Sequence, residues 1–354
     1  MAQDLPRQIF LAPSYSAFGK DKLFDASDPR LNRDDALLPT VRLRNNLLAS
    51  GADIHTDDYL LDLASGLTEA ADYYSFGILR DYDQLCAKFQ LNLRAFVIFE
   101  PPLVARKLYD ALPSISRHFA RVYLHNTHGD GYSLEGVDQT RLHKLFWPQP
   151  YDDVIERYWT NNDRACKLVV INGNHNPLLR LQYGSGELYS ARIRAMAELS
   201  KLDAVDLYGR GWSQWWHPNS MWLPYWQNYG TLMRIYKGSC LSKYEVLGRY
   251  RFCLCIENLT MDGYITEKIF DCLYAGTIPV YIGPKDIDQY VPREAYLDAR
   301  QYRSWTEMWE AVRHLDIGQI ARMKEAGRSF IKSPAGRRYF ESLDKIFSQE
   351  PSGD

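Results

Sequence analysis

The clearest pattern of hydrophobic and polar positions lies in the second half of the chain. An apolar run over Phe252–Ile256 predicts a buried strand, an amphipathic run predicts a helix, and a second apolar run over Ile278–Ile282 predicts another strand. Two parallel strands joined by a helix form a βαβ unit. Glu257 and Asn258 directly follow the first strand, and ligands of open parallel sheets bind outside the carboxyl ends of strands. The pattern therefore predicts a ligand site at these two residues.

The predicted helix has a polar face. Tyr264, Glu267, Lys268 and Asp271 are spaced i, i+3, i+4, i+7, which places them on one side of a helix. The N-terminus of a helix favours an anion, and Lys268 next to it indicates a ligand that carries phosphate. A solvated helix face with an i, i+4 pair is the alternative interpretation of the same spacing.

The rest of the chain alternates in the same way between short apolar runs and amphipathic stretches. The first half predicts strands over Gln8–Pro13, Ala71–Leu79, Arg94–Phe99 and Val122–Leu124, and helices over Val41–Ala49, Gln84–Phe89 and Lys107–Leu112. The second half predicts strands over Lys167–Ile171 and Ala204–Tyr208, helices over Leu188–Leu202 and Ser242–Tyr250, and a mostly helical stretch over Trp305–Ile346. This alternation predicts an α/β protein with two Rossmann-like domains.

The expected domains are residues 1–155 and 156–354, with a connection over residues 141–165 that contains two prolines and clustered aromatics. Whether the C-terminal helices of the second domain cross back to the first domain is left open. The aromatics of the connection, which are Phe146, Trp147 and Tyr151, either wedge the domains or stack on a sugar. A second aromatic stretch, Gly211–Trp226, holds five of the nine tryptophans and either stacks on a sugar or packs on itself.

Composition narrows the class of protein. The 354 residues suit two domains, and a formal net charge of −2 predicts neither nucleic-acid binding nor an anionic membrane partner. The six cysteines lack metal-binding spacing and indicate buried residues in a reducing compartment. Asp4 and Pro6 precede a short apolar run, so neither a signal peptide nor a transmembrane anchor is expected. We expect a cytoplasmic protein, with peripheral attachment to an inner membrane left open.

The βαβ stretch also resembles a known family. The order Glu257-Asn258, Tyr264, Ile-Thr-Glu-Lys at 265–268 and Gly-Thr-Ile-Pro-Val-Tyr-Ile-Gly at 276–283 resembles the donor-site signature of the α-1,3-fucosyltransferases, glycosyltransferase family 10. Ile256 departs from the family, which usually has an aromatic residue there. The resemblance, to the soluble bacterial type, implies a GT-B fold in which two Rossmann-like domains face a cleft.

The resemblance implies a catalytic base in the first domain. Phe99-Glu100-x-Pro102 is similar to the family segment that carries the proposed base, and Glu100 follows a predicted strand. From position alone, an ordinary polar residue at the end of a strand is the alternative.

The remaining site residues implied by the family bind the donor. Arg192 corresponds to the arginine that contacts the diphosphate, whereas Arg194 fits a solvated side chain. The other expected donor-binding residues are Asn258, Tyr264, Glu267 and Lys268, with Glu267 on ribose or fucose hydroxyls and Lys268 on phosphate. Lys237 and Lys243 are possible further phosphate neighbours.

The implied reaction transfers L-fucose from GDP-β-L-fucose, with inversion, to an acceptor glycan. The family favours O3 of N-acetylglucosamine in N-acetyllactosamine, with O4 and O2 left open. No cofactor or metal is expected, because Asp81-Tyr82-Asp83 and Asp286-Ile287-Asp288 are both interpreted as surface charge. The acceptor-binding loops, such as His125–Tyr132, and the oligomeric state are not specified. A transferase of another nucleotide sugar and a non-catalytic glycan- or nucleotide-binding protein are the alternatives.

Overall fold

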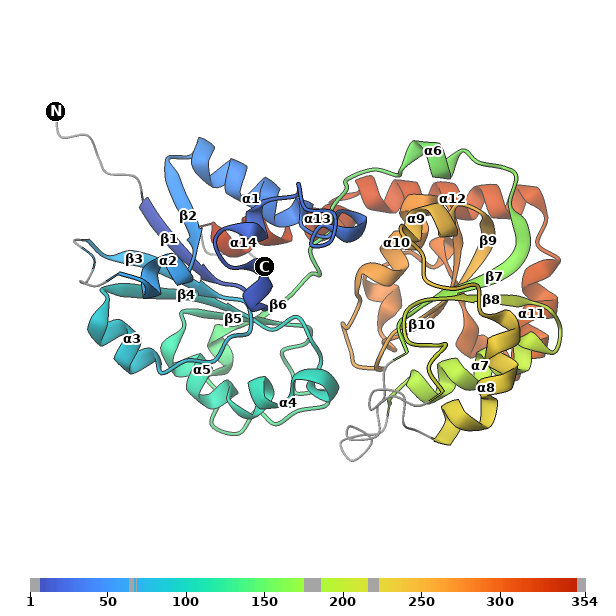
Figure 1. Cartoon of the computed structure of the whole chain (residues 1–354), viewed down its shortest axis with the longest axis horizontal. Coiled ribbons are helices and arrows are strands. Elements are labelled where there is room, and N and C mark those ends of the chain that lie inside the picture. The colour runs from blue at the N-terminus through green and yellow to red at the C-terminus, as the bar shows by residue number, and fades with distance from the viewer. Residues whose placement is uncertain (1–6, 64–66, 68, 175–185, 216–222, 349–354) are drawn as a thin grey trace. The chain divides into compact units, whose positions relative to one another are not determined.

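A computed structural model of the chain describes residues 7–63, 67, 69–174, 186–215 and 223–348. The chain forms two compact units, each with its own parallel sheet (Figure 1). Unit 1 consists of the described residues up to Pro150 and from Arg338 onward, and unit 2 of those from Tyr151 to Arg337. Both units are therefore Rossmann-like α/β layers, as the alternating pattern predicted.

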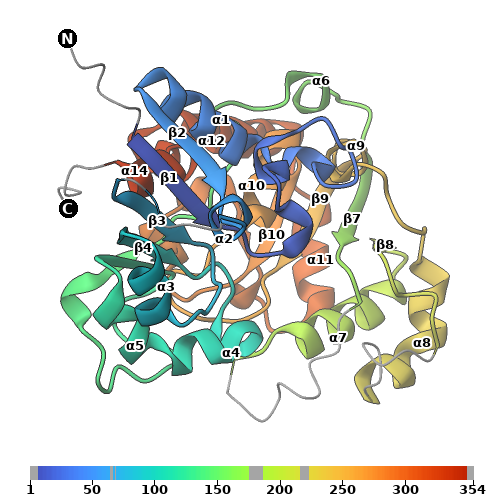
Figure 2. The same ribbon diagram turned by 60° about the vertical axis from the view of Figure 1, so that its left-hand side comes forward.

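Unit 1 contains a six-stranded parallel sheet in the order β2-β1-β3-β4-β5-β6, of which Figure 2 shows β2, β1, β3 and β4 side by side. Its strands are β1 (Arg7–Ala12), β2 (Ala52–Thr56), β3 (Ala71–Ser75), β4 (Leu91–Val97), β5 (Arg121–Leu124) and β6 (Leu142–Lys144). Its helices are α1 (Leu38–Ala49), α2 (Asp58–Leu61), α3 (Tyr82–Lys88), α4 (Pro102–Asp110), α5 (Leu112–His118) and α14 (Ser342–Phe347), and α13 (Pro334–Phe340) crosses from unit 2.

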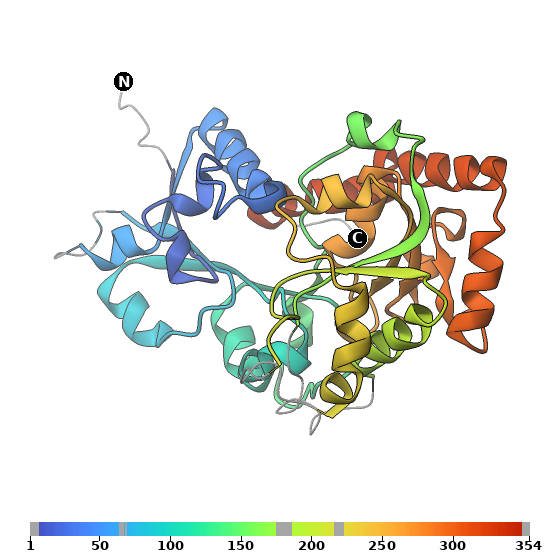
Figure 3. The ribbon, with the colours of Figure 1, turned by 45° about the vertical axis from the view of Figure 1, so that its right-hand side comes forward.

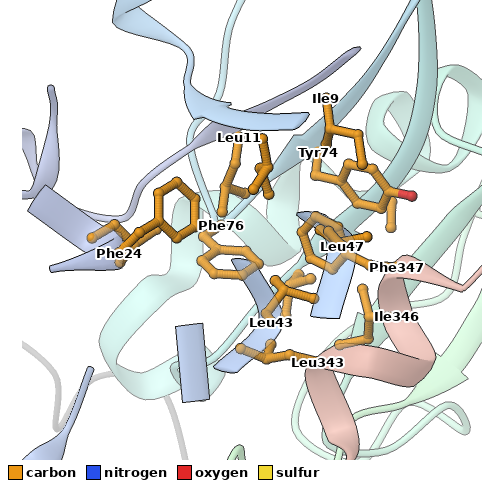
Figure 4. Close-up of a cluster of buried hydrophobic side chains, with 14 of the residues drawn as sticks. Ile9, Leu11, Phe24, Leu43, Leu47, Tyr74, Phe76, Leu343, Ile346 and Phe347 are labelled. Carbon is orange, nitrogen blue, oxygen red and sulfur yellow. The ribbon is translucent and has the colours of Figure 1, made fainter. Parts of the chain in front are cut away.

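Alternate residues of β1 enter two separate cores, because successive side chains of a strand point to opposite faces of the sheet. Ile9 and Leu11 belong to one buried cluster and Phe10 and Ala12 to the other. The first cluster also contains side chains of α1 and of α14, which Figure 4 shows packed together. Figure 4 labels Ile9, Leu11, Phe24, Leu43, Leu47, Tyr74, Phe76, Leu343, Ile346 and Phe347.

The division of the chain departs from the expected ranges at one boundary and resolves a point that was left open. The first unit ends at Pro150 rather than at residue 155, and the residues from Arg338 onward belong to it, which is the crossing back that the expected ranges allowed. The physical reason is burial: Leu343, Ile346 and Phe347 are each 2% exposed or less within the core of unit 1. Their apolar side chains complete a core that the N-terminal segment alone leaves uncovered.

Unit 2 contains a five-stranded parallel sheet in the order β11-β10-β9-β7-β8. Its strands are β7 (Ala165–Ile171), β8 (Val205–Tyr208), β9 (Tyr250–Ile256), β10 (Ile278–Ile282) and β11 (Leu297–Asp298). Its helices are α6 (Glu156–Trp159), α7 (Tyr189–Ser200), α8 (Leu223–Ile235), α9 (Lys243–Leu247), α10 (Glu267–Ala275), α11 (Trp305–Arg313) and α12 (Ile317–Lys332). Figures 1 and 3 show the sheet between two helical layers: α7 contacts α8 and α11, whereas α10 contacts α6, α9 and α12.

The aromatics of the predicted connection pack inside their own units. Phe146 lies edge-on to Tyr339 in unit 1, with ring centroids 5.1 Å apart. Tyr151 packs against Tyr274 in unit 2, with ring centroids 5.2 Å apart. These contacts explain the aromatic density of this stretch as local packing within each unit.

Candidate functional site

The β9–α10–β10 segment of unit 2 forms the frame of the site. β9 and β10 pair in parallel from Phe252 opposite Ile278 to Ile256 opposite Ile282, as the apolar runs predicted. The backbone N–H of Glu257 extends this pairing by donating to the carbonyl of Ile282 at 2.8 Å. Glu257 therefore lies at the carboxyl edge of the sheet, where the pattern placed a ligand site.

Helix α10 begins later than its polar spacing predicted. Thr266 is the N-cap, with extended backbone and a side-chain oxygen that accepts from the N–H of Lys268. Tyr264 consequently precedes the helix and does not share a helical face with Glu267 and Lys268. The helix ends at Gly276, whose φ of 68° is the left-handed conformation that favours glycine.

A buried carboxylate, Glu257, connects the parts of the site. It is 0% exposed and accepts hydrogen bonds from the Thr266 N–H at 3.0 Å, the Thr266 hydroxyl at 2.9 Å and the Tyr281 hydroxyl at 3.3 Å. Its Oε2 also lies 3.0 Å from Nζ of Lys268. Glu257 thus joins the end of β9, the start of α10 and β10 through one side chain. Its position after a strand was noted in the sequence, but nothing there indicated this central role.

Lys268 is held between two carboxylates and a hydroxyl. Its Nζ lies 3.0 Å from Glu257, 3.5 Å from Glu267 and 2.9 Å from Oγ1 of Thr266. Burial alone would lower the pKa of Lys268, but the two carboxylates outweigh it and raise that pKa well above its ordinary value. Burial alone would raise the pKa of Glu267, but the charges of Lys268 and Lys243 outweigh it, so that this pKa is lowered. At neutral pH both side chains are therefore charged.

Arg192 lies on helix α7 and donates hydrogen bonds to the backbone at the end of β9. It is 3% exposed, and its Nη2 donates to the carbonyls of Ile256 at 2.6 Å and Glu257 at 3.1 Å. Burial lowers the pKa of its guanidinium. Its Nε–H is also buried and has no acceptor among the residues that the structure describes, whereas Arg194 on the same helix is exposed. Arg192 therefore has one buried donor that no described residue satisfies.

Asn258 and Tyr264 complete this group. Nδ2 of Asn258 lies 3.4 Å from the hydroxyl oxygen of Tyr264, and its Oδ1 lies 3.5 Å from Nη2 of Arg192. Tyr264 is 1% exposed. The structure thus brings all five expected donor-binding residues together in unit 2, around the end of β9.

A cavity of about 120 Å³ lies beside this cluster, between β7, β9, α9 and α10. Its polar lining includes Asn172, Lys243, Glu267, Lys268 and Asp271. Lys243 forms an ion pair with Asp271 at 2.8 Å, so it neutralises a carboxylate within the same lining. Nucleotide and cofactor pockets commonly measure about 300–1,000 Å³, so this cavity can take only part of a nucleotide sugar.

Glu100 belongs to unit 1. It follows β4 and directly precedes Pro101, the N-cap of α4, and its backbone carbonyl accepts from the hydroxyl of Tyr109 at 3.2 Å. The carbonyl of Phe99 next to it lies 2.6 Å from Nε2 of His125, which is fully buried and stacks on Trp147. His125 is thus a structural residue that supports the backbone next to Glu100.

The other polar and aromatic candidates have local partners. Asp81 caps α3, Oδ1 of Asp286 accepts from the N–H of Gly263 at 2.9 Å, and Lys237 pairs with Asp206 at 3.5 Å. Trp212 is 2% exposed and donates to the carbonyl of Asn172, which follows β7. Residues 216–222 of the tryptophan-rich stretch lie outside the described residues, so the choice between its two interpretations stays open.

Two structural features are absent from the described part of the chain. Among those residues, no group of three or more His, Cys, Asp or Glu side chains is arranged to bind a metal ion. None of the described helices combines the length and apolar composition that a membrane span requires.

The family of this segment follows from comparison with known proteins. Residues 184–323 match the family model described as glycosyltransferase family 10 (fucosyltransferase) C-term. An α-(1,4)-fucosyltransferase of Arabidopsis thaliana is 32% identical over 75 residues, which is 21% of this chain and 19% of that protein. The α-(1,3)-fucosyltransferase FucT of Helicobacter pylori is 27% identical over 99 residues, or 28% of this chain and 21% of that protein. The matches thus span about a fifth of these relatives, and the family expected from the motif is confirmed for this segment.

A solved structure extends the comparison of the fold to nearly the whole chain. An α-glucosyltransferase in complex with UDP-glucose and DNA containing an abasic site covers 96% of this chain and 99% of its own, with a TM-score of 0.55 and 11% identity. At this identity the likeness concerns the fold alone. Together with the two parallel-sheet units, it confirms the predicted pair of Rossmann-like α/β domains of the GT-B type.

Proposed function

Because the chain carries a glycosyltransferase family 10 domain over residues 184–323, we propose that it is an inverting fucosyltransferase. It transfers L-fucose from GDP-β-L-fucose to a hydroxyl of an acceptor glycan. The observation that carries this proposal is the group of five expected donor-binding residues around the end of β9, inside the segment that matches the family.

In the proposed donor complex, the diphosphate lies against Arg192, Lys268 and the N-terminus of α10. Arg192 has a buried Nε–H without an acceptor among the described residues, and the first backbone N–H groups of a helix favour anions. Glu267, whose side chain is 36% exposed, accepts hydrogen bonds from ribose or fucose hydroxyls. Asn258 and Tyr264 contact phosphate or sugar oxygens. The small cavity takes only part of the donor, so the remainder of GDP-fucose is bound outside it.

The proposed reaction is a single displacement at C1 of fucose. The acceptor oxygen forms a bond to C1 while the bond from C1 to the diphosphate oxygen breaks, and the acceptor proton passes to the carboxylate of Glu100. A positioned base of this kind contributes about 10²–10⁴-fold to the rate. The charge that develops on the diphosphate is stabilised by Arg192 and Lys268, so the proposal requires no divalent metal.

The proposed acceptor is N-acetyllactosamine, with transfer to O3 of N-acetylglucosamine. Relatives named as α-(1,3)- and as α-(1,4)-fucosyltransferases both match parts of this chain, so product analysis has to assign the linkage. A cytoplasmic location is part of the proposal, and cell fractionation tests it.

The test is product formation from GDP-L-fucose and N-acetyllactosamine in the presence of EDTA, with GDP-mannose and UDP-glucose as rival donors. The proposal requires a fucosylated trisaccharide from GDP-fucose alone. Transfer from a rival donor would show a transferase of another nucleotide sugar, and GDP binding without any product would favour a non-catalytic protein or a different acceptor. Loss of activity with EDTA would contradict metal independence.

A further inference from the structure

A second and larger cavity lies at the opposite edge of the sheet of unit 2. Its volume is about 500 Å³, and its lining includes Arg164, Arg251 and Gly276. Arg164 directly precedes β7, Arg251 is the second residue of β9, and Gly276 lies just before β10. Because these strands are parallel, this cavity adjoins their amino ends, whereas the candidate donor site adjoins their carboxyl ends. The two sites are therefore separate.

The lining of this cavity is cationic. Arg164, Arg251 and Lys324 contribute positive charge, and no Asp or Glu occurs among the described residues that line it. Arg164 already donates to the carbonyls of Ala275 at 2.7 Å and Tyr250 at 3.2 Å. Arg251 is half-buried, and its guanidinium forms no hydrogen bond or ion pair within the described part of the chain. An oxyanion is the ligand that such an unpaired guanidinium fork fits best.

The other side of the lining is apolar and aromatic. Trp159, at the end of α6, faces Lys324 of α12, whose Nζ lies 4.5 Å from the centroid of the indole ring and 2.5 Å from the backbone carbonyl of Trp159. The indole N–H is buried without an acceptor among the described residues. Ile317 and Ile320 of α12 add apolar surface, and Ile317 is 80% exposed. This side suits a ring or another compact apolar group.

We propose that this cavity binds a small anion in which a phosphate or another oxyanion group is attached to an apolar ring. Arg251 binds the oxyanion, Lys324 adds charge, and Trp159 with Ile317 contacts the ring. The volume lies within the range of about 300–1,000 Å³ that is common for small-molecule sites. The proposal does not depend on the proposed fucosyl transfer, because none of these residues belongs to the candidate donor site.

The charge of Lys324 makes the binding depend on pH. Burial, and then the nearby Arg164, lower the pKa of Lys324 to about 8, against a smaller opposing effect of Glu156. Glu156 is itself paired with Arg328 at 3.4 Å, and Arg164 and Arg251 face Lys324 from the strand ends. Lys324 is thus protonated below about pH 8 and loses its proton above it. The affinity for an anion is therefore expected to fall as the pH rises through this value.

Calorimetric titration with phenyl phosphate tests the site. GDP is left out, because it carries phosphate and a ring and would compete for this cavity. Arg251 lies outside the candidate donor site, so a loss of affinity in its variant assigns the signal to this cavity. The wild-type chain is expected to bind with a dissociation constant of about 1 mM or tighter, and the Arg251→Gln variant at least about tenfold more weakly, because a charged hydrogen-bond partner is lost. Arg251→Gln removes no hydrogen bond or ion pair to a described residue, so the variant is expected to fold. The matched control is Arg322→Gln, which removes an exposed arginine of α12 outside the cavity and should leave the affinity unchanged.

Two further measurements make the outcome clear. Inorganic phosphate should bind more weakly than phenyl phosphate, since it lacks the ring. The affinity for phenyl phosphate should decline between about pH 7 and pH 9, where a phosphate monoester is already a dianion with a second pKa near 6. Absence of saturable binding, or equal affinity in the wild type and in Arg251→Gln, would overturn the proposal. Absence of fucosyl transfer would concern the proposed function alone.

Discussion

The substitution Glu257→Gln is expected to destabilise unit 2 strongly. Glu257 is 0% exposed, and its carboxylate accepts from Thr266, Lys268 and Tyr281 at 2.9–3.3 Å. The amide of glutamine is neutral, so Lys268, with a side chain that is 17% exposed, loses its shorter ion pair. Loss of one partner of a buried pair costs about 3–5 kcal/mol. Because Lys268 keeps Glu267 at 3.5 Å, we expect the lower end, about 3 kcal/mol.

Differential scanning calorimetry measures this effect, since two units give two transitions rather than one two-state unfolding. For a unit of the size of Tyr151–Arg337, 1 kcal/mol shifts Tm by about 2–4 °C, so the transition of unit 2 should fall by about 6–12 °C. The transition of unit 1 should stay in place and serves as an internal reference.

A matched control separates the burial of the carboxylate from its charge. Glu267→Gln removes a carboxylate that is 36% exposed and pairs with the same Nζ at 3.5 Å, and should cost less than about 1 kcal/mol. The double variant Glu257→Gln with Lys268→Met leaves no unpaired ammonium and should be more stable than Glu257→Gln alone. Equal shifts for Glu257→Gln and Glu267→Gln would refute the central role of Glu257.

Three other predictions concern catalysis, donor binding and the frame of the site. Glu100→Gln should lower turnover at least about a hundredfold with GDP affinity unchanged, and near-normal turnover would remove Glu100 as the base. Lys268→Ala should weaken GDP binding about tenfold or more in a titration, and an unchanged affinity would argue against its contact with phosphate. Gly276→Ala should lower Tm by about 2–8 °C, because its φ is +68° and a Cβ would lie 3.0 Å from Lys324 and Trp159. Gly230→Ala in α8, where a Cβ meets nothing within 4 Å, is its control and should not lower Tm.

The frame of the candidate site followed closely from the sequence. The Ile278–Ile282 strand has the predicted bounds. A strand buried on both faces gives an unbroken apolar run, and Gly276 shortly before it marks the end of the preceding helix. The start of α10 did not follow, since the spacing of Tyr264, Glu267 and Lys268 fits a helix whether or not its first residue is helical. The threonine at 266 was the available signal, because threonine is a favoured N-cap.

Other features depend on contacts between distant residues, which a pattern along the chain does not encode. The strands Ala52–Thr56 and Leu142–Lys144 were missed, because a short strand with polar members such as Asp53 and His143 gives little periodic signal. Glu257 looks in sequence like any polar residue after a strand, and its burial results from Thr266, Lys268 and Tyr281. The cavity near Arg251 likewise joins four segments that no motif connects.

The return of the last helix to unit 1 has a consequence for how the protein is made. Leu343, Ile346 and Phe347 fill a core whose other members lie before residue 150. On the ribosome, the first unit must therefore wait for nearly 200 further residues before its core is complete. At about 5–20 residues per second this delay is roughly 10–40 s, during which Tyr74 and Phe76 lack their contacts with Phe347. Unit 2 is continuous in the chain and can fold first, so the order of folding is expected to run opposite to the order of synthesis.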